Sequence, residues 1–362
     1  MRVALLAPCF WPEVRRGGER LVYDLAMGLD ARGHDPALIT SHSGGYRRGR
    51  EFGMEIERVP RLPSRRLARR RYEDHLAHVP FSYLALRRGE PDIAHAFYPT
   101  DALAAQRWSE RGGGPWLMTY LGIPHRLGMS NRRMRVELFQ RACARAGAVV
   151  AISETAADGF RRWFGIEPRV IPPGIDLSTF RPCVERSEAP TIYCAAAAEE
   201  PRKRVGLLVE ALALVRRSRP DATLVLDRPA DPALAHALSQ PGVELRDHPL
   251  DDATLARAYS SAWVSALPSV SDAFGLVLAE ALACGTPAVG TDHGAIPEVV
   301  DRPEIGRLFG GEGPEPLAQA LLEALALAED PGTASACRAR AGDLSRERSA
   351  EAYERLYREL LR

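Results

Sequence analysis

The sequence predicts an α/β protein of two doubly wound domains, each built on a parallel sheet, with a ligand-binding cleft between them. Short apolar segments of strand length alternate with amphipathic segments of helix length, which is the pattern of parallel sheets covered by helices. The length of 362 residues corresponds to two domains. A proline-rich stretch without apolar periodicity, residues 173–190, divides the alternation into two runs and predicts an interdomain linker.

The first run predicts a domain over residues 1–172. Its first strand is the apolar segment 3–7, and a glycine-containing loop is expected at 16–19. The helix that follows, residues 20–31, places its apolar side chains on one face, namely Leu21, Val22, Leu25, Ala26 and Leu29. Further strands are expected at 37–40, 92–96, 116–120, 148–152 and 169–171, and further helices at 101–111, 131–146 and 154–164.

The second run predicts a domain over residues 191–345. Its strands are expected at 191–197, 223–227, 243–246, 263–266 and 288–290, and its helices at 205–217, 252–260, 276–284 and 314–329. Residues 346–362 predict a final helix that is charged and amphipathic.

Composition excludes several classes of protein. Hydrophobic residues make up 46% and charged residues 26% of the chain, which is typical of a folded globular protein. No apolar run approaches the roughly 18 residues of a membrane-spanning helix, and the opening apolar stretch is too short for a signal peptide. The six cysteines lack paired spacing, which indicates a reduced, cytoplasmic protein without a disulfide framework or zinc site.

The sequence motifs of several common enzyme classes are missing. There is no GxGxxG after a strand, no GxxxxGK[ST], no GxSxG and no HExxH. No DxD-type acidic pair follows a strand, so no bound metal is predicted. These absences argue against dehydrogenases, P-loop ATPases, serine hydrolases and zinc proteases.

Residues 268–300 carry the strongest indication of chemistry. A strand is expected to end at Ser269 and a helix to begin near Gly275. The start of a helix presents backbone N–H groups and a dipole that favour a phosphate, and glycine lets a ligand approach the backbone. Asp272 and Glu280 flank this position, and carboxylates accept hydrogen bonds from the hydroxyl pairs of a sugar or a ribose.

A single lysine stands among the 48 basic residues, and all the others are arginine. A compact ammonium differs chemically from a planar guanidinium. In a chain with so strong a preference for arginine, Lys203 is therefore a candidate for a specific role. Net charge is +9 over residues 1–180 and −8 over the remainder, which indicates different partners for the two halves.

The sequence resembles the retaining glycosyltransferases of the group-1 type, family 4, which have the GT-B fold. The resemblance is carried first by Asp272-Ala273-Phe274-Gly275, Glu280 and the run 281–287. In this context the family has an acidic residue and a glutamate separated by seven residues. It extends over nearly the whole chain. The further matching segments, in family order, are Gly17-Gly18-Glu19-Arg20, Arg32-Gly33-His34, 171–176, 180–182 and Arg202-Lys203-Arg204 with 208–211.

This resemblance implies transfer of a hexosyl group from a nucleotide diphosphate sugar to a hydroxyl acceptor, with retained configuration and without a metal or resident cofactor. The two Rossmann-like domains would face the central cleft. Residues 1–172 would bind the acceptor and residues 191–345 the donor, expected to be a UDP- or GDP-sugar. The helix 346–362 would pack back on the first domain.

The matched positions also imply individual roles. Lys203, with Arg202 beside it, would neutralise the donor diphosphate as the glycosidic bond breaks. Glu280 would hold the ribose hydroxyls, and Asp272 stands where the family has a glutamate near the donor sugar. Further donor contacts are expected from Gly17, Gly18, Phe274, Gly275, Leu276 and Val277.

Three positions depart from the family pattern. Asp272 is one methylene shorter than glutamate, Ala197 stands where an arginine is usual six residues before the lysine, and Leu121 stands where many members have a histidine. The residues expected to contact the acceptor are Arg20, His95, Tyr120 and His125.

The sequence leaves the acceptor open, since a small molecule, a lipid and a glycan all fit. The arginine-rich segment from Arg61 to Arg71 fits contact with an anionic acceptor or peripheral association with the inner membrane face. No nucleic-acid-binding motif accompanies it, so no nucleic acid partner is predicted. Two alternatives to a transferase fit the same residues: a nucleotide-sugar epimerase of the same fold, and a catalytically silent nucleotide-sugar-binding protein.

Overall fold

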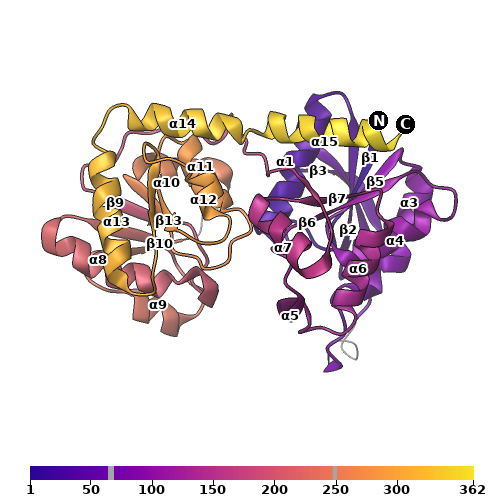
Figure 1. Ribbon diagram of the computed structural model, residues 1–362, viewed down its shortest axis with the longest axis horizontal. Coiled ribbons are helices and arrows are strands. Elements are labelled where there is room, and N and C mark those ends of the chain that lie inside the picture. Colours follow the sequence, from indigo (N-terminus) through magenta and orange to yellow (C-terminus); the bar gives the residue numbers. More distant parts are fainter. Residues whose placement is uncertain (64–68, 248–250) are drawn as a thin grey trace. The chain divides into compact units, whose positions relative to one another are not determined.

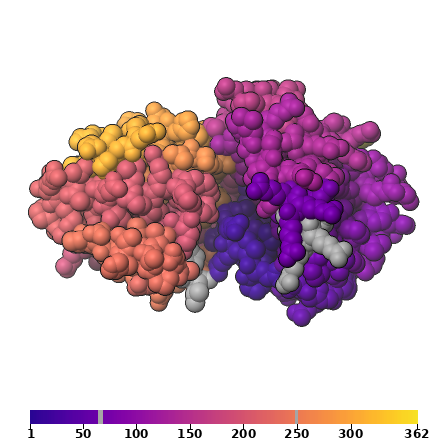
Figure 2. All heavy atoms as spheres, turned by 90° about the horizontal axis from the view of Figure 1, so that it is seen from below, coloured from indigo at the N-terminus to yellow at the C-terminus, as the bar shows by residue number. Residues whose placement is uncertain are grey.

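The computed structural model describes residues 1–63, 69–247 and 251–362, and the chain divides into two compact units (Figure 1). Unit 1 consists of Met1–Gly174 together with Arg346–Arg362, and unit 2 of Ile175–Ser345. Each unit is an α/β domain with its own, mainly parallel sheet. In the space-filling view, the residues of unit 1 are drawn mainly in indigo to magenta and those of unit 2 mainly in pink to yellow (Figure 2). The predicted fold class is confirmed.

Unit 1 is built on an eight-stranded sheet in the order β3-β4-β2-β1-β5-β6-β7-β8, parallel except for the antiparallel pair β3–β4. Its strands are β1 (Arg2–Leu6), β2 (Asp35–His42), β3 (Arg47–Glu51), β4 (Met54–Pro60), β5 (Ile93–Ala96), β6 (Trp116–Tyr120), β7 (Ala148–Ala151) and β8 (Arg169–Val170). Its helices are α1 (Gly17–Ala31), η1 (Leu76–His78), α3 (Val79–Gly89), α4 (Pro99–Ser109), α5 (Arg126–Met129), α6 (Arg135–Arg145), α7 (Glu154–Phe164) and α15 (Arg346–Leu360).

Unit 2 is built on a six-stranded parallel sheet in the order β11-β10-β9-β12-β13-β14. Its strands are β9 (Thr191–Cys194), β10 (Thr223–Asp227), β11 (Val243–Arg246), β12 (Val264–Leu267), β13 (Ala288–Thr291) and β14 (Gly306–Phe309). Its helices are η2 (Pro201–Lys203), α8 (Val205–Ser218), α9 (Pro232–Leu238), α10 (Asp252–Ser261), α11 (Leu276–Ala283), α12 (Ile296–Val299), α13 (Pro314–Leu327) and α14 (Thr333–Asp343).

Residues 47–60 form an antiparallel hairpin that the sequence analysis did not predict. β4 is buried although it contains Glu57 and Arg58, because Glu57 pairs with Arg88 at 2.6 Å and Arg58 with Glu51 at 2.6 Å. These two charges interrupt the apolar pattern by which a strand is recognised. β3 is an exposed, arginine-rich edge strand, and such charge protects a sheet edge from pairing with other chains.

The chain passes between the units twice, at residues 174–175 and 345–346. The two passages lie side by side, since the Ile175 N–H donates to the Leu344 carbonyl at 2.8 Å and Ile175 forms a parallel bridge with Ser345. Most of the stretch expected to be a linker, from residue 175 to 190, belongs to unit 2. There the Trp263 indole N–H donates to the Ser187 carbonyl at 2.8 Å.

The last helix, α15, packs against α1 within unit 1. Gly28 of α1 makes this close approach possible, because a Cβ at that position would lie 2.7 Å from the Cβ of Ala350 and 3.1 Å from the Cγ of Arg346. Directly after the end of α1, the Arg32 guanidinium donates a hydrogen bond to the carboxylate of Glu354 in α15. The helix is thus held by close backbone packing and by an ion pair.

His95 lies beneath α15 and has no exposed surface. One ring nitrogen, Nδ1, bonds to the Tyr357 hydroxyl at 2.7 Å, and the other, Nε2, bonds to the Thr119 hydroxyl at 2.7 Å. The Thr119 hydroxyl also bonds to that of Tyr353 at 3.0 Å. Both ring nitrogens are thus used inside the domain, and contact of His95 with the acceptor stays a prediction. The sequence places it at the end of a strand but does not show which helix covers it.

Acid is expected to weaken the packing around His95. Burial lowers the pKa of His95 to about 3, whereas an unfolded histidine titrates near about 6.5. Between these values the unfolded chain binds a proton that folded unit 1 excludes, so the free energy of unfolding falls as the pH drops through this range. We expect the melting temperature to decline more steeply with acid in the wild type than in His95→Gln. An equal decline in the two proteins would contradict this role.

Candidate active site

Two loops of unit 2 meet at the point where its strand order reverses. The chain winds from β9 through β10 to β11 in one direction, and β12 pairs with β9 on the other side. Doubly wound sheets bind ligands at such a reversal, beyond the carboxyl ends of the strands. The loop after β9 carries η2 with Lys203, and the loop after β12 leads into α11.

Lys203 and Arg202, on the first loop, reach Asp272 on the second. Lys203 Nζ donates to both carboxylate oxygens, at 2.7 and 2.9 Å, and the Arg202 guanidinium donates to Oδ1 at 2.8 Å. Glu200 pairs with the same guanidinium at 2.6 Å. The loops are also joined by their backbones, because the Val270 N–H donates to the Arg202 carbonyl at 3.0 Å. The structure thus brings together three of the residues that the sequence singled out.

Asp272 carries its negative charge in spite of its burial. The residue is 8% exposed, and burial opposes its ionisation. Attraction to Lys203 and hydrogen bonds from Lys203 and Arg202 outweigh this effect and hold the pKa of Asp272 below its usual value. At neutral pH the carboxylate therefore balances one of the two cations that it contacts.

The loop after β12 turns into α11 at Gly275. This residue has a φ of 96°, in the left-handed region that favours glycine. Buried Phe274 anchors the loop, and the helix begins at Leu276. The N–H groups of a first turn, here those of Leu276 and Val277, have no partner within their own helix. This helix start can therefore accept a phosphate at the ligand-binding end of the sheet.

Glu280 follows in the same helix and is 5% exposed. The Tyr259 hydroxyl donates to its Oε2 at 3.2 Å. Burial, reinforced by the negative charge of Glu280, raises the pKa of Tyr259 well above its ordinary value, so the tyrosine stays protonated and remains a donor. The position of the Glu280 carboxylate is thus fixed from inside the domain.

In unit 1, the expected glycine loop is mainly the first turn of α1, which begins at Gly17. The expected start of this helix, at residue 20, is corrected accordingly. The Glu19 carboxylate accepts a hydrogen bond from the Arg16 N–H at 3.0 Å and so stabilises the helix start. Gly18 packs closely on Leu121, since a Cβ there would lie 3.1 Å from the Leu121 Cδ1.

The other residues expected at the acceptor lie on separate elements of unit 1. The Arg20 guanidinium, on α1, is 6.0 Å from the ring centre of Trp11. Tyr120 ends β6 and is half-buried, and burial raises the pKa of Tyr120 to about 12. His125 is exposed and caps α5, where its Nδ1 accepts a hydrogen bond from the Gly128 N–H at 3.2 Å.

The sequence analysis missed a buried pair that joins η1 to α4, the helix that follows β5. His78 Nε2 bonds to Asp101 Oδ1 at 2.8 Å, and both residues are 1% exposed. Their other polar atoms, and the Thr100 hydroxyl beside them, have no partner within the described residues. Buried polar groups are normally hydrogen-bonded, so this end of the unit 1 sheet can take polar ligand atoms or water. The pair is separated by 23 positions in the sequence, and no local pattern links them.

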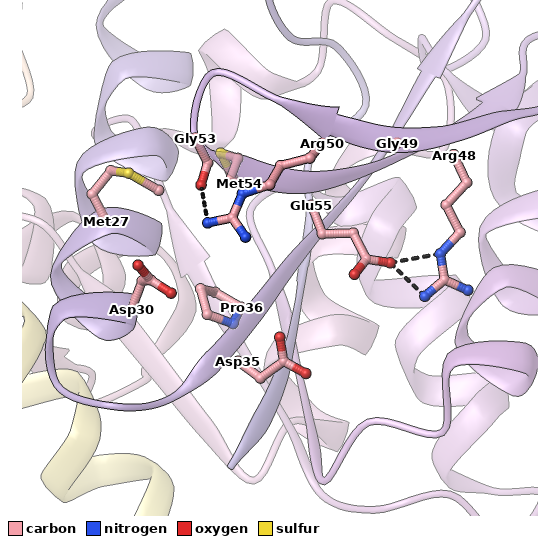
Figure 3. A pocket seen from close by; sticks show the side chains of 10 residues that line it. All are labelled: Met27, Asp30, Asp35, Pro36, Arg48, Gly49, Arg50, Gly53, Met54 and Glu55. Atoms are coloured by element: carbon pink, nitrogen blue, oxygen red, sulfur yellow. Dashed lines mark hydrogen bonds and ion pairs between the residues drawn. The ribbon is translucent and has the colours of Figure 1, made fainter.

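A pocket of about 310 Å³ lies elsewhere in unit 1, between the end of α1, the start of β2 and the β3–β4 hairpin (Figure 3). None of the predicted site residues lines it. In Figure 3, Arg48 points to Glu55 and Arg50 donates to the Gly53 carbonyl at 2.9 Å. These groups satisfy one another, so the pocket gives no indication of a ligand.

The basic segment from Arg61 to Arg71 falls partly outside the described residues, which omit Arg65 and Arg66. Arg61 pairs with Glu13 at 2.7 Å. Within the ranges that the structure describes, no helix is long and apolar enough to span a membrane. Within the same ranges, no cluster of three or more His, Cys, Asp or Glu side chains is arranged to hold a metal ion.

Two protein families match the chain by their sequence models. Glycosyltransferase Family 4 matches residues 15–179, and Glycosyl transferases group 1 matches residues 189–326. A relative, the D-inositol 3-phosphate glycosyltransferase of Paenarthrobacter aurescens, is 28% identical over 331 residues, which cover 82% of this chain and 81% of the relative.

Solved structures share the fold over nearly the full length. Sucrose-phosphate synthase from Thermosynechococcus elongatus has a TM-score of 0.83 at 22% identity, covering 99% of this chain and 98% of its own. Anabaena Alr3699/HepE, in complex with UDP-glucose, has a TM-score of 0.77 at 17% identity, covering 99% of this chain and 100% of its own. These findings favour neither an epimerase nor a silent binding protein. The chain is a glycosyltransferase, and it belongs to the group-1 type, family 4, with the GT-B fold.

Proposed function

We propose that this enzyme transfers a hexosyl group from a nucleotide diphosphate sugar bound by unit 2 to a hydroxyl acceptor bound by unit 1, with retained configuration and without a metal. The observation that carries the donor site is the contact of Lys203 and Arg202 with Asp272, in the loop that leads into α11 at the strand reversal of unit 2. Cationic groups and helix N–H groups in one place suit a diphosphate.

The residues at this point suit departure of a nucleoside diphosphate. The leaving group gains negative charge as the glycosidic bond breaks, and fixed donors aimed at that charge lower the barrier. Lys203 and the N–H groups of Leu276 and Val277 supply such donors. Glu280 accepts hydrogen bonds from the ribose hydroxyls. The acceptor attacks from the side of the leaving group, whose phosphate takes the acceptor proton, so no separate protein base is required.

The nucleotide is proposed to be UDP or GDP. The complex of a structural neighbour with UDP-glucose supports UDP as the first to test. The name of the inositol phosphate relative supports an acceptor that is a polyol with a charged group. Atoms of His78, Thr100 and Asp101 that have no partner within the described part of the chain give unit 1 polar groups for such an acceptor.

We also propose that the enzyme works in the cytoplasm, because all six of its cysteines are free and their spacing fits a reducing compartment. Peripheral contact with the inner membrane face through the segment from Arg61 to Arg71 would bring it to a lipid acceptor. Binding to anionic vesicles, compared between the wild type and a protein with Arg69, Arg70 and Arg71 changed to serine, tests this part.

The donor site is tested by calorimetric titration with UDP, GDP and ADP in the presence of EDTA. We expect one nucleotide to bind with micromolar affinity and the Lys203→Ala variant to bind it more weakly. Binding in EDTA would support metal independence, and analysis of the product anomer would test retention. If the wild type binds none of the three at millimolar concentration, the proposed donor site is wrong.

A further inference from the structure

Asp272 engages the very cations that a donor diphosphate needs. Its carboxylate accepts three hydrogen bonds, two from Lys203 Nζ and one from the Arg202 guanidinium, at 2.7–2.9 Å. The Glu200 carboxylate forms an ion pair with the Arg202 guanidinium at 2.6 Å. Two positive and two negative side chains are thus balanced within the site.

The carboxylate is held more firmly than the cations are. The Ala295 N–H donates to the Asp272 carbonyl at 3.2 Å, and a Cβ on Gly294 would lie 3.1 Å from that same oxygen, so the backbone is enclosed. The Arg202 side chain, in contrast, is 42% exposed, and Lys203 is a flexible four-carbon chain that is 14% exposed. An exchange of partners therefore needs the two cations to swing, while Asp272 stays in place.

A diphosphate is a stronger partner for these cations than a carboxylate is. It carries more negative charge and more acceptor oxygens, and both ammonium and guanidinium groups bind phosphate well. A bound diphosphate also lies close to the negative Asp272, and this repulsion favours its release. The Asp272 carboxylate thus acts twice. It holds the two cations before the donor binds, and it weakens the binding of the product diphosphate after the reaction.

We infer that Asp272 is an internal counter-ion that holds Lys203 and Arg202 in the empty donor site and yields both cations to the diphosphate. The inference rests on the proposed function and gives Asp272 a positioning role in place of the expected contact with the donor sugar. It predicts that loss of this one negative charge tightens nucleotide binding, the opposite of what loss of a ligand contact would do.

The test is titration of the nucleotide that the wild type binds into three variants. Asp272→Asn is expected to raise the affinity about tenfold, because Lys203 and Arg202 lose the negative charge that they share. Asp272→Glu, which keeps the charge, is expected to stay near the wild-type affinity. Asp158→Asn removes an exposed carboxylate of unit 1 that pairs with Arg161, and it is expected to change nothing.

Steady-state kinetics give a second readout. In Asp272→Asn the KM for the donor and the inhibition constant of the product nucleotide should fall together. Glu200→Gln removes one of the two carboxylates that pair with Arg202 and leaves Lys203 bonded to Asp272. It should therefore raise the affinity for the nucleotide by a smaller factor. If circular dichroism shows that Asp272→Asn is unfolded, Glu200→Gln replaces it as the variant that tests the counter-ion role.

The outcomes are separable. Unchanged or weaker binding by a folded Asp272→Asn, while the wild type binds and Lys203→Ala binds more weakly, overturns the counter-ion role and leaves the proposed function standing. If Asp272→Asn is unfolded, unchanged binding by Glu200→Gln overturns the role in the same way. Absence of binding by the wild type and by every variant overturns the proposed function, and the counter-ion role with it.

Discussion

Replacing Lys203 by alanine is expected to lower kcat by about 10²–10³, the usual cost of removing one donor that stabilises a transition-state charge. The side chain is the single ammonium group among 48 basic residues, and it lies at the strand reversal of unit 2. Because the diphosphate gains charge as the bond to the sugar breaks, kcat should fall by a larger factor than the donor KM rises.

Initial rates with varied donor concentration separate these two effects. Lys203→Arg keeps the charge but not its compact geometry, and it should recover only part of the loss. Arg219→Ala removes a cation elsewhere in unit 2, one that pairs with Glu329 at 3.2 Å, and should leave kcat unchanged. A loss in Lys203→Ala that appears only in KM would assign the lysine to ground-state binding alone.

Gly28→Leu is expected to destabilise unit 1 by about 3 kcal/mol. The Cβ alone would lie 2.7 Å from the Cβ of Ala350 and 3.3 Å from the backbone oxygen of Arg346, so α1 and α15 have to separate. The gain in helix propensity over glycine, about 1 kcal/mol, is too small to compensate. For a domain of this size, Tm should fall by about 2–4 °C for each kcal/mol.

Gly206→Leu is the matched control. Gly206 lies in α8 of unit 2, is exposed, and has no atom within 4 Å of an added Cβ. The same substitution there should leave the melting temperature unchanged or raise it slightly. Equal effects at the two positions would show that loss of glycine itself, and not the packing of α15, sets the stability.

The sequence was informative where a function depends on neighbouring residues. The segment from Asp272 to Glu280 is a loop and one helix, so its local pattern was enough to predict a helix that begins near Gly275. The bonds between Lys203 and Asp272 could not be predicted, because 69 positions separate the two residues. Strand order brings them together, and the sequence gives strand positions but no strand order.

The acceptor side was harder to predict for a related reason. The apolar segment 92–96 places His95 near the end of a strand, but the groups that bind it come from β6 and from α15, the latter 262 positions away. His78 and Asp101 have no motif around them, and their pairing depends on how η1 packs against α4. The surroundings of His95 and the pairing of His78 with Asp101 both depend on packing between elements distant in the sequence, and local propensity does not report such packing.

The position of α15 has a consequence for how the protein is made. Unit 1 begins to be synthesised before unit 2 and is completed after it, because helix α15 follows the whole of Ile175–Ser345. At about 5–20 residues per second, a ribosome needs roughly 9–34 s to add that intervening stretch. During this time the growing domain displays the uncovered side of α1 and a strand whose histidine lacks its tyrosine partner. A nascent chain stalled at this stage therefore exposes surface of unit 1 that α15 covers in the finished domain, and exposed surface of this kind favours aggregation.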